Sequence, residues 1–92
     1  MTMINTNADS GTLDATGQAI VPAIQGSGFR PFSVSLNSAS GTREIALSTN
    51  GGVTYDVPDY DKNNATELMV GVLTPVTHIR IKGATGDAWK VY

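Results

Sequence analysis

A short-range alternation of apolar and polar side chains is the feature that most constrains how this chain can fold. Between residues 32 and 36, the apolar Phe32, Val34 and Leu36 alternate with two serines. This period of two residues places the apolar side chains on one face of an extended strand, because successive side chains of a strand point to opposite faces. A helix would need apolar residues three or four positions apart, so the pattern predicts a sheet.

The alternating segments are separated by residues that favour turns. Asn50-Gly51-Gly52 tolerates the positive φ angles of tight hairpins, and it predicts a hairpin between strands at 43–48 and 53–57. Pro22 lacks a backbone N–H donor, so it confines its strand to a sheet edge or a bulge. The predicted strands are, in chain order, 18–24, 32–36, 43–48, 53–57, 67–73, 76–82 and 87–92.

Six or seven short strands predict an all-β fold, a small antiparallel β-sandwich or barrel of the Ig-like or jelly-roll-like type. Residues 1–11 show no periodicity, and we expect them to form an extended or flexible polar arm. Residues 12–92 then form a single domain. Shared parity within the strands predicts a core of Phe32, Val34, Leu36, Ile45, Leu47, Val53, Tyr55, Val70, Ile79, Ile81 and Trp89.

Composition and charge argue against several classes of protein. The chain has no cysteine, which excludes disulfides and thiolate zinc sites. Its net charge of −2 argues against a nucleic-acid partner, because no basic surface is present to neutralise phosphates. Glycine, glutamine and proline interrupt the longest uncharged stretch, 15–29, so we expect no membrane passage. Residues 1–11 lack the features of a secretory signal, and we expect a chain that is made in the cytoplasm and not exported.

The sequence also lacks the motifs of common catalytic mechanisms. His78 is the only histidine, and no Gly-x-Ser-x-Gly elbow is present. The alternation over 76–82 places His78 on the same face as Arg80 and Lys82, which predicts an exposed strand residue. We therefore expect a protein that is not an enzyme, with no catalytic residue and no cofactor.

One acidic segment has the spacing of a calcium-binding loop at its start. Asp59, Asp61 and Asn63 carry oxygens at alternate positions, as the first ligands of such a loop do. The twelfth position, where the loop needs a bidentate acid, is Val70. The missing carboxylate favours a solvated turn, and a weak calcium site at these three residues is the alternative.

Four aromatic residues, Tyr55, Tyr60, Trp89 and Tyr92, could form a platform on which sugars stack. Trp89 shares its parity with Val91 in the last predicted strand, so a position capping the core is favoured for it. A carbohydrate-binding module stays open as an alternative.

Four stretches of the chain carry a resemblance. They are FSVSL at 32–36, EIALSTNGGVTY at 44–55, THIRI at 77–81 and GDAWKVY at 86–92. They form a strand, an Asn-Gly-Gly turn and a Thr-aromatic pair, followed later by an arginine-containing strand, a glycine turn and a closing strand. In this order of features the chain is similar to small β-rich virion proteins of tailed bacteriophages. The resemblance covers about two thirds of the chain, from Phe32 onward.

This resemblance implies a non-enzymatic virion protein, in the first place a capsid decoration (cement) protein on the outer surface of the head. Its partners would be the major capsid protein of the phage and further copies of itself, as a homotrimer or dimer, because small domains are often stabilised by association. It would be made in the host cytoplasm and reside on the virion, without a nucleic-acid or membrane partner. A tail or fibre attachment component, a carbohydrate- or surface-binding module and a calcium-stabilised adhesin domain are the alternative hypotheses.

Overall fold

The structure is a computed structural model, and it describes residues 9–22 and 30–92. Within these ranges the chain is all-β, with no helix. No helical segment there has the length and apolarity to span a bilayer. The strands of the described ranges are β1 (Asp9–Thr12), β2 (Gln18–Pro22), β3 (Phe32–Asn37), β4 (Glu44–Ser48), β5 (Lys62–Asn63), β6 (Glu67–Val72), β7 (His78–Lys82) and β8 (Ala88–Val91).

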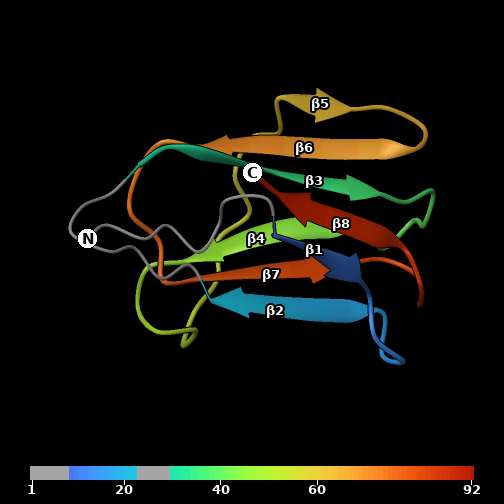
Figure 1. The fold of residues 1–92 in the computed structure, drawn as a ribbon, viewed down its shortest axis with the longest axis horizontal. Coiled ribbons are helices and arrows are strands. Elements are labelled where there is room, and N and C mark those ends of the chain that lie inside the picture. Colours follow the sequence, from blue (N-terminus) through green and yellow to red (C-terminus); the bar gives the residue numbers. More distant parts are fainter. Residues whose placement is uncertain (1–8, 23–29) are drawn as a thin grey trace.

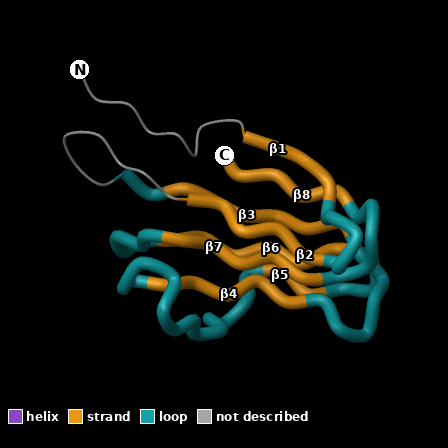
Figure 2. The backbone as a smooth tube through the Cα atoms, turned by 90° about the horizontal axis from the view of Figure 1, so that it is seen from below, coloured by secondary structure: helices purple, strands orange, loops and turns teal. Residues whose placement is uncertain are grey.

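These strands form two antiparallel sheets that pack as a small sandwich (Figure 1). One sheet has five strands in the order β1-β8-β3-β6-β5, and the other has three in the order β2-β7-β4. The connecting loops gather at the two ends of the strands (Figure 2). The predicted all-β sandwich architecture is therefore confirmed.

The core lies between the sheets and follows from the alternation in the sequence. Val34, Ile45 and Ile79 have no exposed surface, and each fully buried side chain of this kind contributes about 1.5–3 kcal/mol. Leu47 and Trp89 are partly buried and pack against this cluster. The predicted core residues that the structure places fully in the interior are Phe32, Val34, Leu36, Ile45, Val70, Ile79 and Ile81.

The predicted hairpin between 43–48 and 53–57 is wrong. β4 pairs with β7, and the returning segment touches β4 at a single bridge, Leu47 to Asp56. The side chain of Ser48 accepts hydrogen bonds from the backbone N–H groups of Asn50 and Gly52, which curls the chain out of the sheet. Val53, predicted in the core, is consequently 80% exposed.

The predicted boundary of the N-terminal arm, residues 1–11, also needs correction. β1 begins at Asp9 and pairs with β8, so residues 9–11 belong to the sheet. Alternation could not reveal this strand, because the polar Ser10 and Thr12 flank Gly11, which has no side chain to bury. Residues 1–8, and the end of the first predicted strand at 23–24, lie outside the described residues.

The outer edge of β4 is sealed by two residues of the following loop. The Tyr60 hydroxyl accepts a hydrogen bond from the Ile45 N–H at 3.1 Å and donates one to the Ile45 carbonyl at 3.2 Å. Asp56 exchanges two backbone hydrogen bonds with Leu47. An exposed strand edge can pair with another chain, and these contacts occupy the groups that would do so.

Candidate functional site

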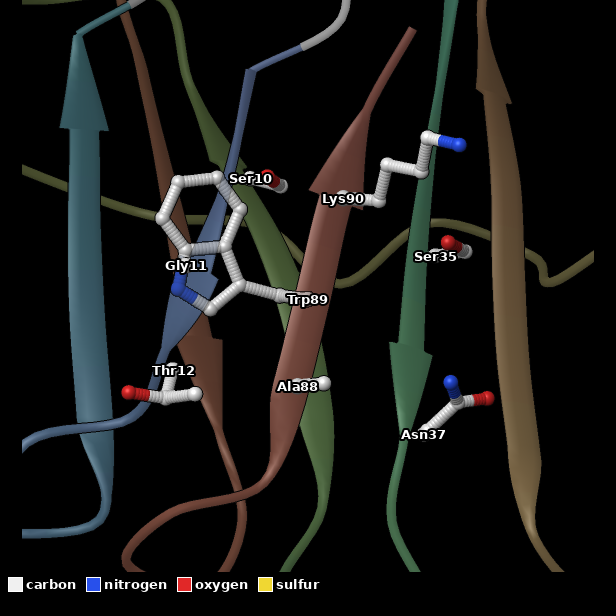
Figure 3. A pocket seen from close by; sticks show the side chains of 8 residues that line it. All are labelled: Ser10, Gly11, Thr12, Ser35, Asn37, Ala88, Trp89 and Lys90. Atoms are coloured by element: carbon white, nitrogen blue, oxygen red, sulfur yellow. The ribbon is translucent and has the colours of Figure 1, made fainter.

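A groove of about 500 Å³ runs along the outer face of the five-stranded sheet, between β1 and β3 (Figure 3). Its outer-face side chains form two rows across the three strands. Ser10, Lys90 and Ser35 stand in register in one row, and Thr12, Ala88 and Asn37 in the other. We call this feature the β8 groove. In it, β8 contributes the small Ala88 between Thr12 and Asn37, and the longer Lys90 between Ser10 and Ser35.

The floor of the β8 groove is braced from the core side. Trp89 shares the parity of the buried Val91 and packs against the core, while Lys90 leaves β8 in the opposite direction (Figure 3). The indole lies against Gly11 of the neighbouring strand, where an added Cβ would come within 2.8 Å of Trp89 Cζ2. The absence of a side chain at Gly11 therefore allows the indole to cover the joint between β1 and β8.

Three polar side chains of the groove are not engaged by any other described residue. The side chains of Thr12, Ser35 and Asn37 make no hydrogen bond to any other residue in 9–22 and 30–92. The Lys90 ammonium lies 5.2 Å from the centroid of the Tyr92 ring, and no carboxylate of the described residues pairs with it. Thr12, Ser35 and Asn37 can therefore bind a ligand without breaking a hydrogen bond to another described residue, and Lys90 can do so without breaking an ion pair of that part of the chain.

The outer face of the three-stranded sheet carries a second polar cluster. Arg80 Nη2 lies 3.3 Å from Glu44 Oε1, and the guanidinium carbon lies 4.5 Å from the centroid of the Tyr55 ring. Arg80 Nε is buried without a hydrogen-bond partner among the described residues. Tyr55 thus holds the loop after β4 against this face, and the cluster ties the loop down instead of forming an open site. The prediction of Tyr55 as a core residue is wrong, because its ring stacks on Arg80 outside the sandwich.

Two of the three candidate calcium ligands, Asp61 and Asn63, accept hydrogen bonds from protein donors. Asp61 Oδ2 accepts a hydrogen bond from the Gly71 N–H at 2.6 Å, which ties the loop to β6. Asn63 Oδ1 accepts one from Arg43 Nη2 at 2.6 Å. Asp59 is exposed, and no hydrogen bond links it to Asp61 or Asn63. Across 9–22 and 30–92, no three acidic, histidine or cysteine side chains gather as a metal site requires.

The four aromatic residues considered as a sugar platform lie on different parts of the molecule. Tyr60 seals the β4 edge, Tyr55 covers Arg80 and Trp89 packs on the core. Tyr92 follows β8 beside Lys90 and is 44% exposed. His78 is half-buried, and its Nδ1 lies 3.2 Å from the Thr77 hydroxyl.

Three carboxylates with lowered pKa values support turns. Hydrogen bonds from the side chain and backbone of Thr16 lower the pKa of Asp14. The Ser38 side chain and the Ala84 backbone N–H lower the pKa of Asp87. A hydrogen bond from Lys62, 3.0 Å away, lowers the pKa of Glu67. Each shift stabilises a local turn or strand pair, and none of these acids lies in the β8 groove.

Sequence reasoning missed the β8 groove because its residues come from three segments far apart in the chain. Ser33 and Ser35 in one strand, and Ala88 and Lys90 in another, were recognisable as solvent-facing positions. Nothing in their spacing showed that β3 and β8 are neighbours, or that β1 completes the other wall. Comparison with protein-family models, with curated proteins and with solved structures finds no significant match to this chain.

Proposed function

We propose that the chain is a non-enzymatic structural component of a tailed-bacteriophage virion, acting as a capsid decoration (cement) protein. In this role it binds the major capsid protein on the outer head surface and strengthens the shell through contacts between its own copies. The proposal rests on the resemblance of residues 32–92 to small β-rich virion proteins, combined with the distribution of exposed apolar side chains.

Exposed apolar side chains at one end of the sandwich are the observation that carries the proposal. Val53 is 80% exposed and Leu73 is 77% exposed. Thr77 joins their loops, because it donates hydrogen bonds to the Ser48 carbonyl and accepts one from the Gly51 N–H. We call these two exposed side chains, Val53 and Leu73, the apolar end.

A partner that covers the apolar end would remove these side chains from water. Burial of one Val or Leu side chain contributes about 1.5–3 kcal/mol. A capsid surface or a second copy of the chain would provide such cover, which agrees with a protein that works by surface contact.

Binding to heads tests this function directly. Heads of the phage whose genome encodes the chain, stripped of decoration proteins, would be co-sedimented with wild-type protein and with the double variant Val53→Asp/Leu73→Asp. We expect wild type to bind and the variant to lose binding while keeping its thermal midpoint, because both positions are exposed. Ala65→Asp, at an exposed turn between β5 and β6, is the matched control and should bind as wild type does.

Two further readouts separate the alternatives. Gold-labelled antibody on purified virions should decorate heads, whereas label on tails or fibres would favour an attachment component. Size-exclusion chromatography with light scattering should show a dimer or trimer that the double variant reduces. Absence of the chain from purified virions would overturn the proposal.

A further inference from the structure

We propose that the β8 groove binds an acidic saccharide, a sugar unit that carries a carboxylate. This inference does not depend on attachment to a capsid, since it rests on the outer face of the five-stranded sheet and not on the apolar end. Four observations carry it: the size of the groove, its unused hydrogen-bonding groups, the position of Lys90 and the rigidity of the floor.

The polar side chains frame a space of the right size for one sugar ring. The two rows are two residues apart along the strands, about 7 Å, and β1 and β3 are two strand spacings apart, about 9.5 Å. Ser35 and Asn37 stand along one side of this frame and Thr12 along the other, with Ala88 between Thr12 and Asn37. A pyranose ring seated over Ala88 would direct its hydroxyls toward the polar side chains at the edges.

The hydrogen-bonding character of the frame matches a polyhydroxylated ligand. The hydroxyls of Thr12 and Ser35 and the amide of Asn37 can each donate and accept, as sugar hydroxyls do. None of them is engaged by another described residue. A solvent-facing sheet is ordinarily polar, but polarity alone does not produce a groove of about 500 Å³.

Lys90 adds a charge preference to the groove. Lys62 pairs with Glu67, and Arg80 pairs with Glu44. The Lys90 ammonium instead lies near the Tyr92 ring, at one end of the groove, without a carboxylate. It would pair with a carboxylate on the bound sugar, which distinguishes an acidic saccharide from a neutral one.

The floor needs no rearrangement to receive a ligand. β8 is paired on both sides, with β1 and with β3, and Trp89 packs from the core side against Gly11. Sites on rigid strands lose little conformational freedom when they bind.

Amide NMR titration of the full chain tests the inference. The probes are trigalacturonate, maltotriose as the neutral oligomer, and polyglutamate as an anion without sugar. We expect trigalacturonate to shift the amide signals of β1, β3 and β8. Maltotriose should shift the same signals with about threefold weaker affinity, because it lacks the carboxylate that forms one exposed ion pair. Polyglutamate should leave these signals unchanged.

Variants at the groove identify the contacts. Ala88→Phe fills the groove and should abolish binding, while Ala65→Phe, at an exposed turn, should not. Lys90→Gln should weaken trigalacturonate about threefold and leave maltotriose unchanged, and Lys82→Gln, on the other sheet, should change neither. Asn37→Ala, which needs no accommodation of a larger side chain, should weaken both sugars.

Three results would overturn the inference. They are the absence of shifts with either sugar, equal shifts with polyglutamate, and unchanged binding in Ala88→Phe with a wild-type thermal midpoint. Equal affinity for both sugars, unaltered by Lys90→Gln, would refute the preference for an acidic saccharide. Because the Val53→Asp/Leu73→Asp variant retains the groove, it should bind trigalacturonate normally even where capsid binding is lost.

Discussion

Replacing Gly11 with alanine should weaken the joint between β1 and β8, although position 11 lies on an edge strand. The new Cβ would stand 2.8 Å from Cζ2 and 3.0 Å from Cε2 of Trp89. Gly11 does not adopt a positive φ, so its backbone conformation suits alanine. Any loss of stability therefore comes from displacement of the indole.

Two opposing effects set the size of this loss. Overpacking a filled site costs about 1–3 kcal/mol, whereas alanine reduces the entropy of the unfolded chain and returns about 0.4–1 kcal/mol. The net destabilisation is between about 0 and 2.6 kcal/mol, centred at about 1.3 kcal/mol. In a domain of this size, each kcal/mol lowers the thermal midpoint by about 4–8 °C.

Thermal and urea unfolding followed by circular dichroism would measure the effect. Gly41→Ala is the matched control, because a Cβ at Gly41 has no neighbour within 4 Å and the backbone there is not at positive φ. The control should be stabilised by about 0.4–1 kcal/mol. A Gly11→Ala variant as stable as the control would refute the steric argument.

A double-mutant cycle with Trp89→Leu assigns the clash to the indole. Leucine is shorter and also removes the indole N–H, which is buried without a partner among the described residues. In this background Gly11→Ala should be neutral or stabilising, which corresponds to a coupling of about 1 kcal/mol or more. A coupling near zero would show that other neighbours oppose the added methyl group.

Three further predictions concern the loops. Tyr60→Phe should lower the free energy of unfolding by about 0.5–1.5 kcal/mol and increase self-association measured by light scattering, because it frees the Ile45 backbone groups at the β4 edge. A variant with unchanged stability and unchanged self-association would contradict the role of Tyr60 in covering this edge. Folding lowers the pKa of Asp87, so the ionised carboxylate stabilises the fold fully above the ordinary pKa of 3.8, and this stabilisation is lost as pH falls through the lower folded pKa. Asp87→Asn should therefore lower the thermal midpoint at neutral pH and flatten the fall of the midpoint below about pH 4. Parallel pH profiles of the midpoint in wild type and variant would refute the assignment. Millimolar calcium should leave the thermal midpoint unchanged, because Asp61 and Asn63 already accept hydrogen bonds from Gly71 and Arg43. A rise of the midpoint by more than about 2 °C would contradict this prediction and support calcium binding at the loop.

The sequence by itself determined the fold class and most of the core. Alternation with a period of two is a local property, and burying one face of each strand is sufficient to turn it into a sandwich. Val34, Ile45 and Ile79 therefore lie in the interior as predicted. Trp89 packs against the core, as its shared parity with Val91 indicated.

Tertiary structure decided which strands became neighbours, and with that the loops and the β8 groove. The Asn50-Gly51-Gly52 turn formed, with φ angles of 78° and 86° at the two glycines, but hydrogen bonds to Ser48 and Thr77 directed the chain away from a hairpin. Strand partners are chosen by contacts between residues distant in sequence, and no local pattern records that choice. The same reason explains why Thr12, Asn37 and Lys90, each an ordinary surface residue in its own segment, surround one groove only after the sheet is assembled.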